Sequence, residues 1–193
     1  MPGGHAMSAF DRRTAEHGAL LVVDVQERLL PAILGHARLL ANALTLVQGA
    51  RILGVRVFAT EQYPRGLGPT VEPLASLIPT RPSKRAFHCL GAPGLAEALA
   101  EGDIRHVTLV GIEAHVCVAQ TALELLKLGY AVQVPADAVG SRFAVDQEFA
   151  LRRLERAGAV VTTTEAALFE WIESAEHPRF KEVSALVKAR PAE

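Results

Sequence analysis

The chain has 193 residues, of which 50% are hydrophobic and 21% are charged, and its formal net charge is −1. This length predicts one domain with a sizeable core, and the large apolar fraction excludes extensive intrinsic disorder. The near balance of charges excludes a strongly basic surface for nucleic acid or anionic membrane, and two cysteines are too few for a disulfide scaffold or a thiolate zinc site.

The amino terminus carries no apolar run of signal-peptide length. Apolar stretches elsewhere, such as residues 19–23 and 107–110, are far shorter than the roughly 20 residues needed to span a bilayer. We therefore expect a flexible leader over residues 1–13, a single domain over residues 14–193, and a cytoplasmic location without a membrane partner.

Buried strands and amphipathic helices alternate along the chain. Residues 19–25 form an apolar run interrupted by Asp24, which is typical of a strand buried on both faces. Comparable strands are predicted at residues 55–60, 107–111, 131–134 and 159–163. Helices are predicted at residues 36–53, 93–100, 145–157 and 165–173, in a segment ending at residue 128, and in a short tail reaching about residue 188. Residues 61–82 are rich in proline and glycine, so we expect a long loop there that could carry binding residues.

Strands that alternate with helices indicate a parallel sheet with right-handed crossovers. We therefore predict a three-layer α/β/α, Rossmann-like fold with a mostly parallel, doubly wound sheet. Ligands of such folds bind at the carboxyl ends of the strands. Neither glycine motif for nucleotide phosphates follows a predicted strand, so a nucleotide-binding protein is disfavoured.

Two side chains near that edge of the sheet are candidates for chemistry. Asp24 interrupts an apolar strand, where a carboxylate is either a turn residue or a functional group with a perturbed pKa. Cys117 lies near the start of the helix that follows residues 107–111, where the helix dipole favours a thiolate and backbone N–H groups could bind an oxyanion. A buried structural cysteine is the commoner alternative, and it is our interpretation of Cys89.

The sequence spacing offers no clear partner for the thiol. His115 is two residues from Cys117, and residues two apart on a helix do not face each other. A lone lysine such as Lys84 is normally solvated, so composition alone assigns it no catalytic role.

Asp24, Lys84 and Cys117 nevertheless occur in segments that resemble the isochorismatase-like family of cysteine hydrolases. The matching segments are Leu21-Val-Val-Asp24-Val-Gln26, Lys84-Arg-Ala-Phe87 and Val110-Gly-Ile-Glu-Ala-His-Val-Cys117-Val. The resemblance extends over nearly the whole chain from about residue 14. Three further segments are similar to the subgroup of isochorismatase domain-containing proteins: Thr60-Glu-Gln-Tyr-Pro-Arg-Gly-Leu-Gly-Pro-Thr70, Asp137-Ala-Val-Gly-Ser-Arg142 and His177-Pro-Arg-Phe-Lys-Glu182.

The resemblance implies an Asp–Lys–Cys triad and a thioester intermediate. Cys117 would attack an amide or related carbonyl, and Asp24 would take the thiol proton and later help to activate water. Lys84 would hold Asp24 and stabilise the thiolate. The backbone N–H groups of Glu113 and Cys117 would form the oxyanion hole, in a turn where the family often has a cis peptide bond, here near residues 112–113.

The resemblance also implies residues that bind the substrate. Gln26 would line the pocket or orient the triad. Glu61, Gln62 and Tyr63 follow the second predicted strand and would line the pocket mouth, although a solvated loop is an equally good interpretation of these three residues.

This part of the chain departs from the metal-binding nicotinamidase branch of the family. That branch has an Asp-x-His pair and a further histidine, whereas this chain reads Glu61-Gln62-Tyr63-Pro64-Arg65. We therefore expect no metal and no other cofactor, and a pyridine carboxamide becomes a disfavoured substrate. The isochorismatase branch proper cleaves a vinyl ether without a thiol nucleophile, so Cys117 favours chemistry on an amide or ester.

We therefore predict a metal-independent cysteine hydrolase that acts on a C–N bond of a small amide-like substrate, whose identity the sequence does not reveal. Alternatives are a vinyl ether hydrolase and a non-catalytic binding or assembly protein that retains the fold. The partners we expect are a small molecule, no nucleic acid, and further copies of the chain in a dimer or tetramer. Phe169, Trp171 and Phe180 either form a contact surface or dock the terminal helices on the domain.

Overall fold

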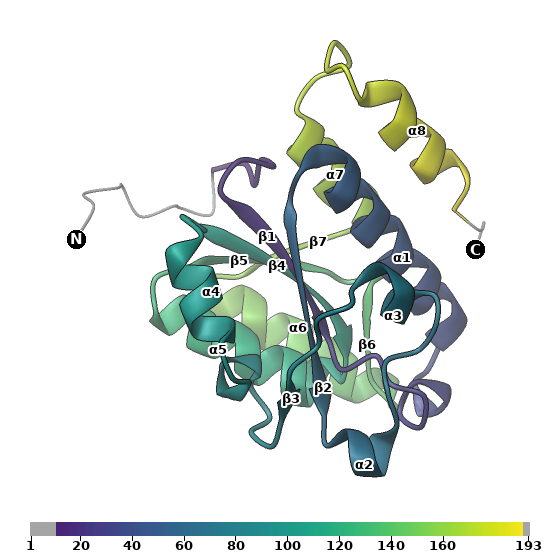
Figure 1. Cartoon of the computed structure of the whole chain (residues 1–193), viewed down its shortest axis with the longest axis vertical. Coiled ribbons are helices and arrows are strands. Elements are labelled where there is room, and N and C mark those ends of the chain that lie inside the picture. The colour runs from purple at the N-terminus through teal and green to yellow at the C-terminus, as the bar shows by residue number, and fades with distance from the viewer. Residues whose placement is uncertain (1–10, 191–193) are drawn as a thin grey trace.

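The structure, a computed structural model, describes residues 11–190 and has the predicted three-layer α/β/α architecture (Figure 1). The strands are β1 (Gly18–Val23), β2 (Arg56–Gln62), β3 (Ser83–Lys84), β4 (His106–Ile112), β5 (Ala131–Pro135), β6 (Val139–Gly140) and β7 (Val160–Thr162). The α-helices are α1 (His36–Leu53), α2 (Pro64–Leu67), α3 (Leu74–Leu77), α4 (Leu95–Glu101), α5 (Ala119–Lys127), α6 (Ala144–Arg156), α7 (Thr164–Ile172) and α8 (Phe180–Lys188). Shorter helical turns are η1 (Leu30–Ala32), η2 (Cys89–Gly91) and the π-helical η3 (Ala114–Val118).

The sheet is doubly wound. Its strand order is β3-β2-β1-β4-β5-β7, with β6 beside β4, and every pairing between these strands is parallel. The chain runs outward from β1 through β2 to β3, then returns to β4 and continues through β5 to β7 on the other side. The strand order therefore reverses between β1 and β4, and such a switch point opens a crevice at the carboxyl ends of the strands.

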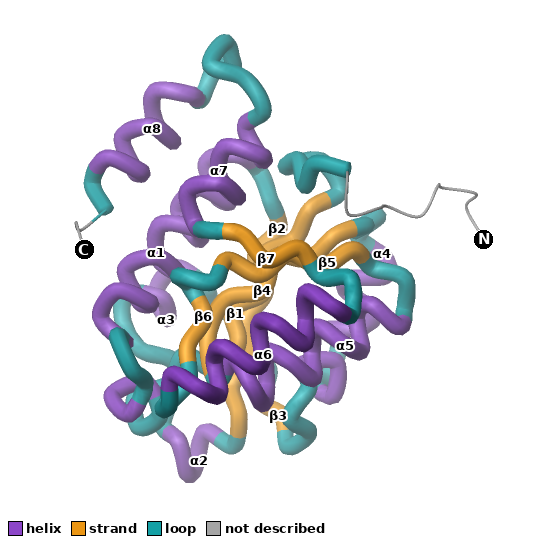
Figure 2. Tube along the Cα trace, turned by 180° about the vertical axis from the view of Figure 1, so that it is seen from behind, coloured by secondary structure: helices purple, strands orange, loops and turns teal. Residues whose placement is uncertain are grey.

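Both faces of the sheet are buried under helices, as Figure 2 shows from behind. Leu20 of β1 packs in one apolar cluster with Leu46 of α1 and Leu168 of α7. The next residue, Leu21, faces the opposite cluster, which includes Leu154 of α6 and residues of α4 and α5. Side chains alternate across a strand, so a strand covered on both faces needs a continuous apolar sequence.

The long periodic elements lie close to their predicted positions, whereas four of the shortest elements were not predicted. Helix α1 has the predicted bounds, and its cap Gly54 adopts the left-handed conformation with its N–H donated to the Ala50 carbonyl. The two-residue strands β3 and β6, and the helices α2 and α3 in the loop over residues 61–82, are too short for hydrophobic periodicity to predict them.

The first turn after β4 also differs from the regular helix we predicted. It is π-helical over Ala114–Val118, because the N–H of Val118 bonds to the carbonyl of Glu113 five residues before it. Single π-turns within helices are frequent at functional sites.

The two ends of the described chain pack on the domain. Residues 1–10 of the expected leader lie outside the described residues, whereas Arg13 is buried and donates its backbone N–H to the Glu170 carboxylate at 3.1 Å. Trp171 is buried in the core, and the rings of Phe169 and Phe180 lie 6.4 Å apart. These aromatic contacts dock α7 and α8 on the domain. Within residues 11–190, no helix has the length and apolarity that a membrane crossing requires.

Gly111 allows the close approach of β1 and β4 at the switch point. It pairs with Val23, has φ +116°, and a Cβ atom at this position would overlap the Val23 backbone. We predict that Gly111→Ala lowers the free energy of unfolding by at least about 3 kcal/mol, because steric overlap adds to about 1–3 kcal/mol of backbone strain. Urea unfolding measures this. The control is Gly158→Ala, since Gly158 has φ +101° with open space around it, and should lose about 1–2 kcal/mol. Equal losses in the two variants would contradict the prediction.

Candidate active site

The carboxyl ends of β1, β3 and β4 bring together the three residues of the expected triad. Asp24 follows β1, Lys84 is the last residue of β3, and Cys117 lies in η3, which follows β4. The register aligns these ends, because Val23 pairs with both Thr60 and Gly111. Asp24, Lys84 and Cys117 are separated by 60 and 33 residues in the sequence, and they therefore meet at the switch point.

Asp24 is a fully buried carboxylate with three partners. Its φ of +50° turns the chain out of β1, so that strand geometry ends at Val23. The Thr60 hydroxyl donates to Oδ1 at 2.8 Å, and Lys84 Nζ donates to Oδ2 at 2.7 Å. The carboxylate also interacts with the thiol of Cys117, since each group shifts the pKa of the other. Asp24 therefore links the candidate nucleophile to the candidate cation.

Lys84 uses all its donors within the protein. Besides Asp24, Nζ donates to Gln62 Oε1 at 2.8 Å and to the Phe87 carbonyl at 3.0 Å, with the Ala86 carbonyl more distant at 3.4 Å. An ammonium group has three N–H donors, and the three closest acceptors account for them. The side chain is also completely buried. Lys84 therefore acts here as a fixed positive charge, with no donor left for another molecule.

Burial raises the pKa of both Asp24 and Cys117. For Asp24, desolvation outweighs the opposing effects of the Lys84 charge and the hydrogen bonds from Lys84, Thr60 and Cys117. For Cys117, desolvation and then the Asp24 charge raise the pKa well above that of a free thiol, although Lys84 lowers it. Burial and the Asp24 charge thus oppose the helix dipole that we expected to favour a thiolate. The arrangement pairs a thiol of raised pKa with a carboxylate that can accept its proton.

Two threonines and Cys89 form a chain of contacts that connects Asp24 to the backbone of Cys117. Thr60 Oγ1 also contacts Cys89 Sγ at 3.2 Å, the Cys89 N–H donates to Thr121 Oγ1 at 2.9 Å, and Thr121 Oγ1 donates to the Cys117 carbonyl at 2.6 Å. Burial raises the pKa of Cys89 to about 11. Sequence analysis missed both threonines. The position of Thr60 near the carboxyl end of β2, next to the strand that precedes Asp24, was the available signal.

The four predicted substrate-binding residues have different surroundings. Gln26 is fully buried, and its amide bonds to the backbone of Gln62 and to the Gly68 carbonyl. The Glu61 carboxylate accepts from the N–H and hydroxyl of Thr70 and from Arg81. These two side chains hold the loop over residues 61–82 against the sheet.

The other two predicted residues reach the surface. Gln62 bonds to both Lys84 and the residue that follows it. Its Oε1 accepts from Lys84 Nζ, and its Nε2 donates to the Arg85 carbonyl at 3.1 Å. Tyr63 precedes α2, has 41% of its surface exposed, and carries the Arg85 guanidinium over its ring at 4.1 Å from the centroid.

The polar side chains at the end of β2 do not fit a metal. Glu61 is neutralised by Arg81 and bonded to Thr70, and Gln62 is bonded to the Lys84 ammonium. Among residues 11–190, no group of three or more histidine, cysteine or carboxylate side chains has the geometry of a metal site. Metal independence stays a prediction.

The turn between β4 and η3 carries the expected cis peptide bond, at Ile112–Glu113. The Glu113 carboxylate pairs with Arg142 at 3.0 Å, and His115 bonds to the Ser141 hydroxyl at 2.9 Å and lies 3.8 Å from the Asp146 carboxylate. Both side chains therefore bind the segment leading into α6. His115 has its partners away from the thiol, as its spacing from Cys117 predicts.

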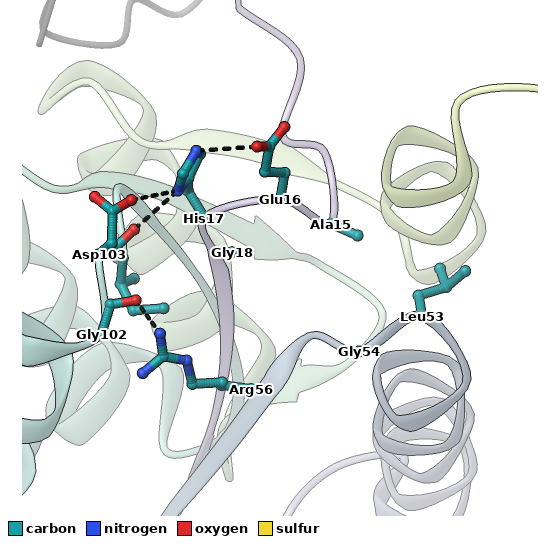
Figure 3. Close-up of a pocket in the computed structure, with 10 residues that line it drawn as sticks. Ala15, Glu16, His17, Gly18, Leu53, Gly54, Arg56, Gly102 and Asp103 are labelled. Atoms are coloured by element: carbon teal, nitrogen blue, oxygen red, sulfur yellow. Dashed lines mark hydrogen bonds and ion pairs between the residues drawn. The ribbon is translucent and has the colours of Figure 1, made fainter.

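A cavity of about 490 Å³ lies at the opposite edge of the sheet from the triad, where the strands begin (Figure 3). His17 there bonds to Asp103 and lies near Glu16, and Arg56 bonds to the Gly102 carbonyl. The polar groups of this cavity bind one another, and it contains no residue of the triad.

Comparison with known proteins identifies relatives over most of the chain. The sequence profile of the isochorismatase domain matches residues 18–166. Isochorismatase domain-containing protein 2 of Danio rerio is 39% identical over 94% of this chain and 92% of that protein. Isochorismatase domain-containing protein 1 of Danio rerio is 42% identical over 88% of this chain, which spans only 60% of that longer protein. The solved structure of the MAR1 ribonuclease from Caenorhabditis elegans has a TM-score of 0.88 and 38% identity, covering 94% of this chain and 95% of that chain.

The Asp24–Lys84 pair can be tested through stability. We predict that Lys84→Met lowers the free energy of unfolding by about 3–5 kcal/mol, because it leaves a buried carboxylate without its cation. The double variant Asp24→Asn/Lys84→Met removes both charges and should recover most of that loss. Lys127→Met is the control, since Lys127 is exposed in a surface ion pair and should change stability by less than about 1 kcal/mol. Urea unfolding measures these changes. A loss in the double variant that equals the sum of the losses in Asp24→Asn and Lys84→Met would show that the two charges are not coupled.

Proposed function

The chain belongs to the isochorismatase family, and on that premise we propose that it is a metal-independent cysteine hydrolase of a small amide-like substrate. One observation carries the proposal: at the switch point of the sheet, the Asp24 carboxylate is hydrogen-bonded to the Lys84 ammonium and interacts with the Cys117 thiol. Such an arrangement pairs a nucleophile with a base and holds the base in place by a fixed charge.

In the proposed first step, Cys117 Sγ attacks the substrate carbonyl carbon while its proton passes to Asp24. The C–S bond forms as the carbonyl becomes an oxyanion, which the backbone N–H groups of Glu113 and Cys117 stabilise. The oxyanion then collapses, the C–N bond breaks, and Asp24 returns the proton to the leaving amine. The product of this half-reaction is a thioester on Cys117.

In the second step, water attacks the thioester and gives a proton to Asp24. The C–O bond forms, the C–S bond breaks, and the proton on Asp24 returns to the sulfur. The raised pKa of Asp24 suits both steps, because a carboxylate that holds a proton more tightly than usual is a better base near neutral pH. Lys84 keeps its proton throughout and offsets the negative charge that passes between Asp24 and Cys117.

A ribonuclease is the second candidate, since the Caenorhabditis elegans relative at 38% identity is named as one. The near-neutral net charge of this chain favours a small molecule over a polyanion. An RNA substrate should therefore accompany the amides and esters in any activity screen.

The homo-oligomer that we expect is tested separately by light scattering of the full chain.

Hydrolysis is the direct test of the proposal. In a screen of small amides, esters and one RNA oligonucleotide, we predict turnover of an amide or ester that Cys117→Ala reduces at least about 10³-fold, because no other group there can form the acyl intermediate. Arg153→Ala is the control, since Arg153 is exposed on the far end of α6. Turnover that survives in Cys117→Ala would overturn the thioester mechanism, and RNA cleavage alone would favour the second candidate.

The pH dependence of alkylation tests the role of Asp24. Since burial raises the pKa of Asp24, we predict that iodoacetamide labelling of Cys117 rises with pH through a midpoint above the ordinary aspartate value of about 4. In Asp24→Asn this rise should be lost, and labelling at pH 7 should fall at least about tenfold, since burial raises the pKa of the thiol itself. Mass spectrometry of the labelled peptides compares Cys117 with Cys89. Unchanged labelling in Asp24→Asn would contradict the base assignment.

A further inference from the structure

A cavity of about 350 Å³ lies beside the triad, at the carboxyl ends of β2 and β3. Tyr63 and Arg65 form one wall, at the start of α2, and Ser83 to Ala86 form the opposite wall around β3. Of the predicted site residues, only Tyr63 and Lys84 line this cavity, and Arg65 and Arg85 line it with them.

The cavity is lined by positive charge without a matching carboxylate. Arg65 and Arg85 are exposed, and no acidic residue of the described chain lines the cavity with them. Within residues 11–190, neither arginine forms an ion pair, whereas Arg81, Arg142 and Arg190 are each bonded to a carboxylate. Two unneutralised guanidinium groups in one concave site favour an anion.

The orientation of Arg85 suits a bound carboxylate or phosphate. Its guanidinium lies over the Tyr63 ring, so one planar face is covered by the ring. The N–H donors of a guanidinium lie in its plane, which leaves them at the edges for a planar or tetrahedral anion. Lys84 cannot take this role, because its three donors are already bonded to Asp24, Gln62 and Phe87.

Hydrogen bonds connect the cavity to the triad. The Tyr63 N–H donates to the Lys84 carbonyl at 3.1 Å, and Gln62 bonds at once to the Lys84 ammonium and to the Arg85 carbonyl. Lys84 and Arg85 are therefore neighbours in sequence at the end of β3, and the same glutamine bonds to both.

We propose that Arg65 and Arg85 bind an anionic group of the substrate, so that the preferred substrate of the site is a small amide or ester that also carries a carboxylate or phosphate. This inference rests on the proposed function, since it deepens the same site. The cavity supplies the charge recognition, and Cys117 supplies the chemistry on the uncharged end of the molecule.

A pair of alkylating reagents that differ in charge tests the proposal. Iodoacetate carries a carboxylate and iodoacetamide does not, so the ratio of their labelling rates at Cys117, divided by the ratio for free cysteine, reports attraction of an anion to the site. We expect this normalised ratio to fall at least about threefold in Arg65→Ala/Arg85→Ala and to fall with added salt in the wild type. The iodoacetamide rate itself should stay unchanged in that variant.

Matched variants separate this effect from a general change in charge. Arg153→Ala/Arg156→Ala also removes two exposed arginines without ion pairs among the described residues, from the distant end of α6, and should leave the ratio unchanged. Arg65→Lys/Arg85→Lys keeps the charge and should retain most of the ratio. A normalised ratio that is the same in the wild type and in Arg65→Ala/Arg85→Ala would overturn the proposal.

A binding measurement keeps this test independent of the proposed function. If iodoacetamide labels Cys117 no faster than Cys89, the hydrolase proposal fails, and calorimetric titration with succinate at constant ionic strength still tests the cavity. We expect succinate to bind the wild type and to lose at least about tenfold in affinity in Arg65→Ala/Arg85→Ala. Absent binding by succinate, or binding through both arginines by an RNA oligonucleotide alone, would overturn the assignment of a small anionic substrate.

Discussion

The buried ion pair between Asp24 and Lys84 is the interaction on which the rest of the site depends. Both side chains are removed from water, which is costly for isolated charges and is tolerated when each is paired and hydrogen-bonded. The ammonium has three close acceptors, and Asp24 is hydrogen-bonded to Lys84 and Thr60 and interacts with the Cys117 thiol. Burial thus raises the pKa of the thiol and leaves a carboxylate near it, as the proposed general base mechanism requires.

The doubly wound topology explains why this pair can exist. Parallel strands bring all their carboxyl ends to one edge, and the reversal between β1 and β4 leaves space there for side chains from both halves of the sheet. Gly111 lets β4 approach the Val23 backbone, and the π-turn that follows holds Cys117 over the end of β1. A carboxylate from one half and a thiol from the other are therefore in contact across the switch point.

The periodic elements and two of the triad residues could be predicted from the sequence, because their signals are local. Asp24 interrupts an apolar strand, Cys117 follows another strand, and α1 repeats its apolar residues at helical spacing. Lys84 could not be predicted from its own surroundings, since its burial arises from a two-residue strand with no periodicity, and resemblance to a family was needed. Thr121 and the arginine-lined cavity had no sequence signal, because their roles depend on contacts with distant segments.

The sequence by itself determined the fold class, the family and the candidate triad, since continuous apolar strands and recurrent motifs are properties of neighbouring residues. Only the tertiary structure decided the direction of the shift in the thiol pKa, the three acceptors that occupy the donors of Lys84, and the different contacts of Gln26, Glu61, Gln62 and Tyr63. Those properties follow from desolvation and from hydrogen-bond partners far away in the chain. Both are set by three-dimensional packing, which the order of residues determines only through the complete fold.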